Sequence, residues 1–200
     1  MSRMLSTVAL MLLAFVGFAA SAGTASAQAF TGDIVVGKPE APVTIIEYAS
    51  LTCPHCATFQ TGTLPEFKKE YIETGKVKIV YRDFPLDGIA LRASQIARCG
   101  GPDRAAGFVD VFFRQQAQWA AAKDPLAALK QIGKFGGLSD AQMDACLADK
   151  ALEEAVLNSR MEGQTKYKVN STPTLIINDK NYPGAASLAD LKKIVDPLIK

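Results

Sequence analysis

The chain has 200 residues, a length that fits one domain with an insertion or two small domains. Its 22 basic and 20 acidic residues give a formal net charge of +2 at pH 7. Proteins that bind nucleic acid usually carry a clear basic excess, so this near balance argues against that class.

The first 27 residues are typical of a secretory signal peptide. They contain one basic residue, Arg3, an apolar run over 8–20, and the small-x-small sequence Ala25-Ser26-Ala27, after which cleavage is expected. An uncleaved membrane anchor is the alternative, although the apolar run is short for a membrane span. We therefore expect an exported protein whose four cysteines meet an oxidising compartment.

A cysteine pair follows a predicted buried strand. Residues 33–37 indicate a short edge strand, residues 43–49 form an apolar, β-branched run, and Cys53-Pro54-His55-Cys56 then begins a predicted helix. Unpaired amides and the helix dipole would stabilise a thiolate at Cys53, and a protonated His55 would add a nearby cation. The motif predicts a redox-active dithiol with a strongly oxidising disulfide. We expect Cys53 to be exposed and Cys56 shielded, because a substrate thiol must reach the first sulfur.

Two other interpretations of this motif remain open from the residues alone. A CxxC pair is half of a zinc site, but the chain has one histidine and no second CxxC, so we predict no metal. A purely structural disulfide is the other interpretation, although rings closed by CxxC are tight and usually reactive.

Glu47 breaks the apolar pattern of the strand that precedes the motif. A central parallel strand is apolar on both faces, and a buried carboxylate is costly. Glu47 either faces water at the strand end or serves the active site, where perturbed ionisable groups tend to gather.

The segment after the motif predicts a βαβ unit. A helix starting at Cys56 should kink or break near residues 62–64, because Gly62 and two threonines are poor helix formers and Pro65 fits the first turn of a renewed helix over 65–74. A strand over 77–81 follows. Strand, helix and strand in this order favour a parallel sheet with a right-handed crossover.

An Ala-rich, helix-forming region occupies residues 86–166. It contains Cys99 and Cys146, which are the remaining pair if Cys53 bonds to Cys56; two free buried thiols are the alternative. A bridge would close a 47-residue loop and stabilise the fold by roughly 3–4 kcal/mol. The expected helices are 89–99, 104–119, 125–135, 139–147 and 151–167.

The last part of the chain returns to strand and ends in a helix. Residues 174–178 and 181–182 predict two pairing strands, and 187–199 a capped amphipathic helix. Pro173 comes just before the first of these strands, where an ordinary trans proline is tolerated.

These features resemble the DsbA family of periplasmic thiol-disulfide oxidoreductases. The resemblance is carried by Glu47, by Cys53-Pro54-His55-Cys56, which is close to diagnostic, by the tract from Tyr81 to Leu86, and by Ser171-Thr172-Pro173-Thr174. Together these matches span nearly all of the mature chain.

The resemblance implies an α/β protein with a thioredoxin-like fold and an inserted all-helical domain. The thioredoxin-like domain would comprise 28–85 and 167–200, and the helical insertion 86–166. Glu47 would help to move a proton to and from Cys56, and Pro173 would be a cis proline beside the active-site disulfide. Thr172 would face the cysteines and bind substrate, although threonine at this position leaves the oxidase or isomerase subclass open.

The expected function is donation of the Cys53–Cys56 disulfide to reduced or unfolded exported proteins by a periplasmic monomer. The redox-active disulfide is the only expected cofactor, and the resemblance implies reoxidation by a membrane quinone-linked partner of the DsbB type. The alternatives are a disulfide isomerase or reductase of the DsbC/DsbG kind and a non-catalytic chaperone-like binding protein.

Overall fold

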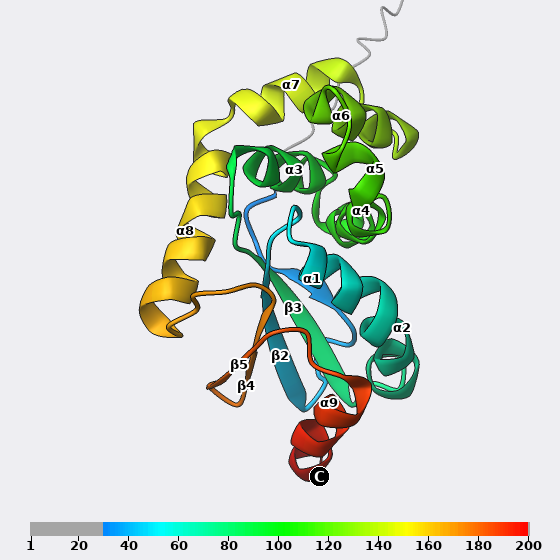
Figure 1. Cartoon of the computed structure of the whole chain (residues 1–200), viewed down its shortest axis with the longest axis vertical. Coiled ribbons are helices and arrows are strands. Elements are labelled where there is room, and N and C mark those ends of the chain that lie inside the picture. The colour runs from blue at the N-terminus through cyan, green and yellow to red at the C-terminus, as the bar shows by residue number, and fades with distance from the viewer. Residues whose placement is uncertain (1–29, 200) are drawn as a thin grey trace, which may run out of the picture.

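A five-stranded sheet forms the centre of the computed structural model, which describes residues 30–199; the predicted signal peptide lies outside them. The strand order is β1-β3-β2-β4-β5 (Figure 1). The strands are β1 Ile34–Val36, β2 Val43–Ala49, β3 Val77–Asp83, β4 Thr174–Ile177 and β5 Lys180–Pro183.

Strand β2 lies in the middle of the sheet. It pairs in parallel with β3 and antiparallel with β4, while β1 and β5 form the edges. The parallel β2–β3 pair confirms the predicted βαβ unit, and the mixed α/β architecture is the thioredoxin-like fold that the family resemblance implied. The carboxyl end of β2 delivers the chain to the CPHC motif, where α/β sheets place their chemistry.

The kink or break predicted near residues 62–64 does not interrupt the helix after the motif, although its hydrogen bonding changes there. This helix passes through α1 Pro54–Thr58, a π-helical turn η1 Phe59–Thr63, α2 Leu64–Phe67 and a second π-helical turn η2 Lys68–Ile72. In η1 the N–H of Leu64 donates to the carbonyl of Phe59, five residues earlier. Pro65 lacks an N–H and its ring crowds the preceding turn, so the widened turn just before it accommodates the ring without ending the helix.

Six helices between β3 and β4 form the predicted helical region. The prediction of one helix over 104–119 is wrong, because the chain turns at Gln115 (φ −104°, ψ 13°) between α4 and α5. This turn leaves the Phe112 carbonyl free to accept a bond from the Trp119 indole Nε1 at 2.8 Å. The helices are α3 Gly88–Cys99, α4 Pro102–Arg114, α5 Gln116–Ala120, α6 Pro125–Phe135, α7 Asp140–Ala148 and α8 Lys150–Lys166.

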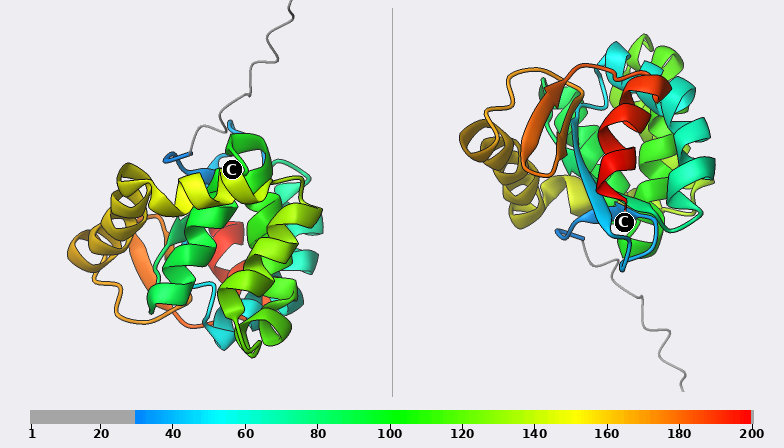
Figure 2. Two further views of the ribbon diagram at one scale, coloured as in Figure 1. Left: turned by 90° about the horizontal axis from the view of Figure 1, so that it is seen from above. Right: turned by 90° about the horizontal axis from the view of Figure 1, so that it is seen from below.

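Helices cover both faces of the sheet. Figure 2 shows α8 on one face and, on the other, the helix that follows the motif together with α9 Leu188–Val195, which a short 3₁₀ turn η3 Asp196–Leu198 extends. Phe67 and Leu191 belong to the core under α9. Under α8, a Cβ at Gly163 would lie 2.8 Å from the Tyr48 ring, so this position requires a glycine for close packing.

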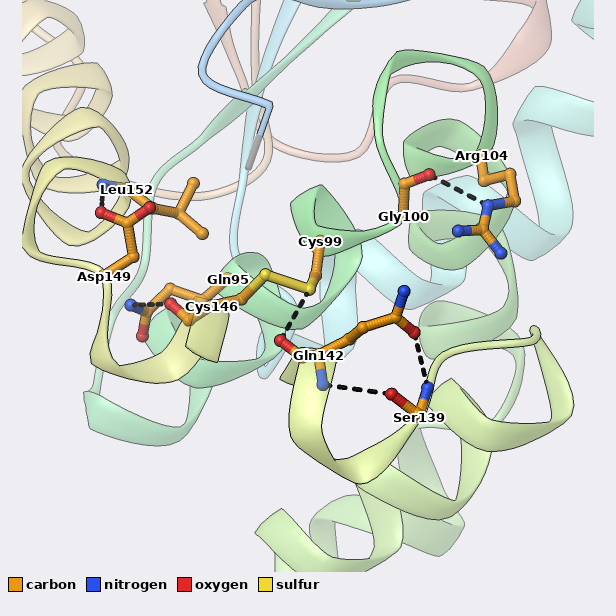
Figure 3. The surroundings of a disulfide bond; sticks show 9 residues. All are labelled: Gln95, Cys99, Gly100, Arg104, Ser139, Gln142, Cys146, Asp149 and Leu152. Carbon is orange, nitrogen blue, oxygen red and sulfur yellow. Dashed lines mark hydrogen bonds between the residues drawn. A yellow bond between two sulfur atoms is a disulfide. The ribbon is translucent and has the colours of Figure 1, made fainter. Parts of the chain in front are cut away.

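Cys99 of α3 and Cys146 of α7 form the predicted disulfide, with a Cα–Cα distance of 5.9 Å. The alternative of two free buried thiols is therefore wrong. Figure 3 shows the bridge, with Gln95 one turn before Cys99 donating through Nε2 to the Cys146 carbonyl at 3.3 Å. Among the helices of residues 30–199, none combines the length and apolar character that a membrane crossing would need.

Candidate active site

The CPHC motif occupies the first turn of α1. Cys53 is the N-cap residue in an extended conformation, and Pro54 takes the next position, where its missing N–H has no helical partner to lose. The Cys53 N–H donates to the Ser50 carbonyl at 3.0 Å, which closes the turn between β2 and the helix. Both cysteines are free thiols in this structure. Local sequence thus places Cys53 at the N-cap position of α1, at the positive end of the helix.

Cys53 is less accessible than the sequence predicts. Cys53 is 6% exposed and Cys56 is 0% exposed. Cys53 is thus the more accessible of the two, as expected, but the prediction that it is exposed is wrong. The reason is tertiary: the loop before β4 packs over the motif, and the Cys53 Sγ lies 3.2 Å from the Thr172 carbonyl.

The surroundings of Cys53 favour its thiolate. A hydrogen bond from the Cys56 thiol is the largest cause that lowers the pKa of Cys53 to about 5, against the opposing effect of burial. The nearby Thr172 side chain and the backbone N–H groups of Cys56 and His55 also act to lower the pKa of Cys53. As a thiol, Cys53 can instead donate to the Thr172 carbonyl. Loss of the proton ends this weak donor bond and leaves a sulfur anion close to groups that favour negative charge.

His55 contributes to this site through its backbone N–H, while its side chain is exposed. The sequence assigned its effect to the charge of the imidazole. The structure adds an effect of the His55 backbone on the pKa of Cys53, which does not depend on the side chain. The imidazole charge itself stays a prediction.

Cys56 faces the protein interior and has the opposite preference. Burial, followed by the hydrogen bond to Cys53, raises the pKa of Cys56 far above its usual range, and the nearby Glu47 carboxylate adds to this. At neutral pH the pair therefore holds one thiolate, on Cys53, and one thiol, on Cys56. This division fixes which sulfur is the stable anion once the disulfide has been reduced.

Glu47 is wholly buried in β2, so the interpretation that it faces water is wrong. Burial raises the pKa of Glu47 to about 7, although a hydrogen bond from Gln60 Nε2 to its Oε2, at 2.8 Å, acts in the opposite direction. Its other oxygen, Oε1, makes no hydrogen bond within residues 30–199. A carboxyl group with a pKa near 7 can both give and take a proton at neutral pH.

A pocket of about 400 Å³ reaches Glu47 and Gln60 from the side of the molecule. Tyr81, the partner of Glu47 in the parallel register of β2 and β3, also lines it, and the exposed Lys69 and Arg114 lie at its polar margin. The pocket thus approaches the buried carboxyl group, which itself remains 0% exposed.

The peptide bond between Thr172 and Pro173 is cis, as the family resemblance implied. The Pro173 carbonyl accepts a hydrogen bond from the Gly184 N–H at 2.8 Å, which ties the loop to the chain just after β5. The loop therefore lies against Cys53 in a defined position. The substrate-binding role of Thr172 and Pro173 stays a prediction.

Two glutamines of the site were missed from the sequence. Gln60 lies one helical turn after Cys56, and this i,i+4 spacing could have placed it on the same face. Gln116 is brought to the motif by the turn at Gln115, which no local pattern indicated. Among residues 30–199, no group of three or more His, Cys, Asp or Glu side chains is arranged to hold a metal ion.

The sheet, the cysteine pair at the end of its central strand and the cis proline opposite define a thioredoxin-like protein with an inserted helical region. The family profile described as Thioredoxin matches residues 30–197, and the chain belongs to this family.

Similar proteins agree with the predicted DsbA relationship. The crystal structure of alpha-DsbA1 from Wolbachia pipientis matches with a TM-score of 0.78 and 29% identity, covering 84% of this chain and 91% of that one. Disulfide bond formation protein D of Bacillus subtilis is 25% identical over 84% of this chain and 78% of its own length. A Rickettsia bellii protein named as a protein-disulfide oxidoreductase is 30% identical over 82% of this chain. The chain spans 65% of that relative and 61% of one from Rickettsia typhi, less than two thirds of each.

Proposed function

We propose that the protein is a thiol-disulfide oxidoreductase that works as an oxidase, passing its Cys53–Cys56 disulfide to reduced or unfolded exported proteins. The observation that carries this proposal is the opposite preference of the two sulfurs, with the pKa of Cys53 lowered to about 5 and that of Cys56 raised. Interactions that stabilise the Cys53 thiolate exist only in the reduced protein, so they favour its reduction and make the disulfide oxidising.

The reaction begins when a substrate thiolate attacks the sulfur of Cys53. The Cys53–Cys56 bond breaks, a mixed disulfide joins Cys53 to the substrate, and the sulfur of Cys56 leaves with the electron pair and takes up a proton. A second substrate thiolate then attacks the substrate sulfur of the mixed disulfide and releases Cys53 as a thiolate. The substrate gains one disulfide, and the two electrons it loses reside in the reduced cysteine pair.

Glu47 supports the first of these steps as the local proton donor. Its pKa of about 7 keeps a large fraction protonated at neutral pH, and its charge acts on Cys56 from within the same buried region. Gln60 holds one carboxyl oxygen and leaves the other unpaired within the described chain. We expect the proton to return to solvent through the pocket beside Gln60 during reoxidation.

Substrate binding is proposed at the loop of Thr172 and Pro173. This loop is the segment that packs on the Cys53 sulfur, so a chain bonded to Cys53 must pass beside it. Backbone pairing there would recognise extended chains with little dependence on sequence. We further propose a periplasmic monomer, without a bound cofactor, that a membrane quinone-linked partner of the DsbB type reoxidises.

The test is equilibration of the mature protein with glutathione, followed by oxidation of a reduced, unfolded substrate protein. An oxidase should hold its disulfide weakly and transfer it stoichiometrically, and Cys53→Ser should abolish transfer. A disulfide much more stable than that of glutathione, combined with faster reshuffling of scrambled substrates than oxidation of reduced ones, would support an isomerase or reductase instead. Protection of substrates by the Cys53→Ser variant would support the chaperone-like alternative.

A further inference from the structure

The helical region reaches into the reactive turn through one buried amide. Gln116, the first residue of α5, is 8% exposed, and its Nε2 donates to the carbonyls of Leu51 at 2.7 Å and Cys53 at 3.0 Å. Helices α4 and α5 lie beside the end of the sheet from which α1 starts (Figure 1). A single side chain thus binds two backbone groups of the segment that carries the nucleophile.

The two carbonyls lie between the end of β2 and the start of α1. Leu51 follows β2 directly within the connecting turn, and the Cys53 carbonyl also accepts the first helical bond of α1, from the Ala57 N–H at 3.2 Å. Leu51 is wholly buried and Cys53 nearly so, which means that these carbonyls would lose a partner and gain little water if the amide were removed. Gln116 therefore holds the turn between strand and helix at two points, one in its middle and one where the helix begins.

The turn between α4 and α5 aims this amide. A continuous helix over 104–119 would carry Gln116 on in the direction of α4, but the chain turns at Gln115 instead. The Trp119 indole bond to the Phe112 carbonyl stabilises the turned arrangement from the buried side. The departure from a regular helix and the double hydrogen bond of Gln116 are thus parts of one arrangement.

We propose that Gln116 is a positioning residue for the active site, which holds the Leu51–Cys53 turn so that Cys53 stays at the N-cap position of α1. The inference deepens the proposed oxidase function and rests on it. Gln116 belongs to the helical insertion, so the inference also gives this insertion a part in shaping the active site. Release of the turn would move Cys53 relative to the first turn of α1 and weaken the effect by which the backbone of Cys56 and His55 lowers the pKa of Cys53.

The experiment compares Gln116→Met with Gln95→Met in the full mature protein. Methionine keeps the length of glutamine but has no amide donor. Gln95 is a matched control, since it too is a buried glutamine of the helical region and donates through Nε2 to a backbone carbonyl, that of Cys146, away from the motif. Both variants should lose stability, so stability alone does not distinguish a positioning role from packing.

The distinguishing readouts are the thiolate titration of Cys53, followed by ultraviolet absorbance, and the equilibrium constant with glutathione. We expect Gln116→Met to raise the pKa of Cys53 and to weaken the protein as an oxidant by about two- to tenfold, the factor that corresponds to one ordinary hydrogen bond. Gln95→Met should leave both quantities at the wild-type values. If the first variant does not fold, Gln116→Leu, which removes the amide donor without adding a charge, serves in the same comparison.

A folded Gln116 variant with the titration and glutathione equilibrium of the wild type would overturn the proposal. That outcome differs from failure of the proposed function, which would appear as a wild-type disulfide that is not oxidising. The effect of Gln116 on the Cys53 titration can be measured in either case.

Discussion

Ionisation of Cys53 should make the folded protein more stable as the pH rises. The pKa of this thiol falls from its ordinary value of 9.0 to about 5 in the folded protein. At pH 7 the unfolded chain keeps the proton and the folded chain does not, which corresponds to about 2–3 kcal/mol of extra stability by linkage. Because the folded pKa is lowered, this contribution grows above pH 5 by about 1.4 kcal/mol per pH unit and is lost as the pH falls through 5.

Two serine variants isolate this contribution. Cys53→Ser removes the thiolate, whereas Cys56→Ser keeps it and retains a hydroxyl that can donate to the Cys53 sulfur. Neither variant can form the active-site disulfide, and both keep the bridge between Cys99 and Cys146. Chemical denaturation of the two proteins at a series of pH values measures the difference between their free energies of unfolding.

The informative quantity is the pH dependence of that difference. A serine in the wholly buried position of Cys56 adds a constant offset, but it adds no titration between pH 4 and pH 8. We expect the Cys56→Ser variant to gain stability relative to Cys53→Ser from pH 5 upwards, by about 2–3 kcal/mol at pH 7. A difference that stays flat over this range would refute the reasoning that the folded structure stabilises the Cys53 thiolate.

Three further predictions concern other residues of the molecule. Ionisation of Glu47 destabilises the folded protein, because its pKa is about 7 in the folded state and 4.5 ordinarily. The stability contributed by the protonated carboxyl group is fully present below pH 4.5 and is lost as the pH rises through 7. Glu47→Gln should therefore stabilise the protein at pH 8 by on the order of 3 kcal/mol in denaturant titrations. Joint replacement of Cys99 and Cys146 by alanine should lower the free energy of unfolding by roughly 3–4 kcal/mol while oxidase activity persists, and an inactive but folded variant would contradict a purely structural bridge. His55→Ser should raise the pKa of Cys53 only modestly, since the exposed imidazole is lost but the backbone N–H remains; an unchanged absorbance titration would show that the imidazole charge has no effect there.

The reactive turn could be predicted from the sequence because its determinants are local. An apolar β-branched strand, a proline at the first helical position and two cysteines one turn apart specify a strand, a turn and a helix within 14 residues (43–56). The pairing of Cys99 with Cys146 also followed from counting the cysteines. Such signals need no knowledge of how distant segments pack.

Most of the features that escaped prediction depend on distant segments. The low exposure of Cys53 results from the loop at Thr172, which is 119 residues away in the sequence. The turn at Gln115 lies in a stretch of good helix formers. It is stabilised by tertiary contacts, the hydrogen bonds of Gln116 to the motif. The uninterrupted helix through Pro65 depends on a π-helical turn, which propensity scales do not represent.

The two edges of the sheet bear on how the molecule can handle unfolded chains without joining them. Strand β1 has three residues, and β5 is a mostly exposed stretch that starts at Lys180 and ends at Pro183. A short strand, a charged side chain and a proline are the means by which proteins discourage a foreign strand from extending a sheet. An unfolded client should therefore find no lengthy ladder of backbone groups to add to, and its stay should be set by the covalent bond at Cys53 and its immediate surroundings. Under the proposed oxidase function, turnover then depends on chemistry that reverses within one encounter, and the protein is protected from co-aggregating with its substrates.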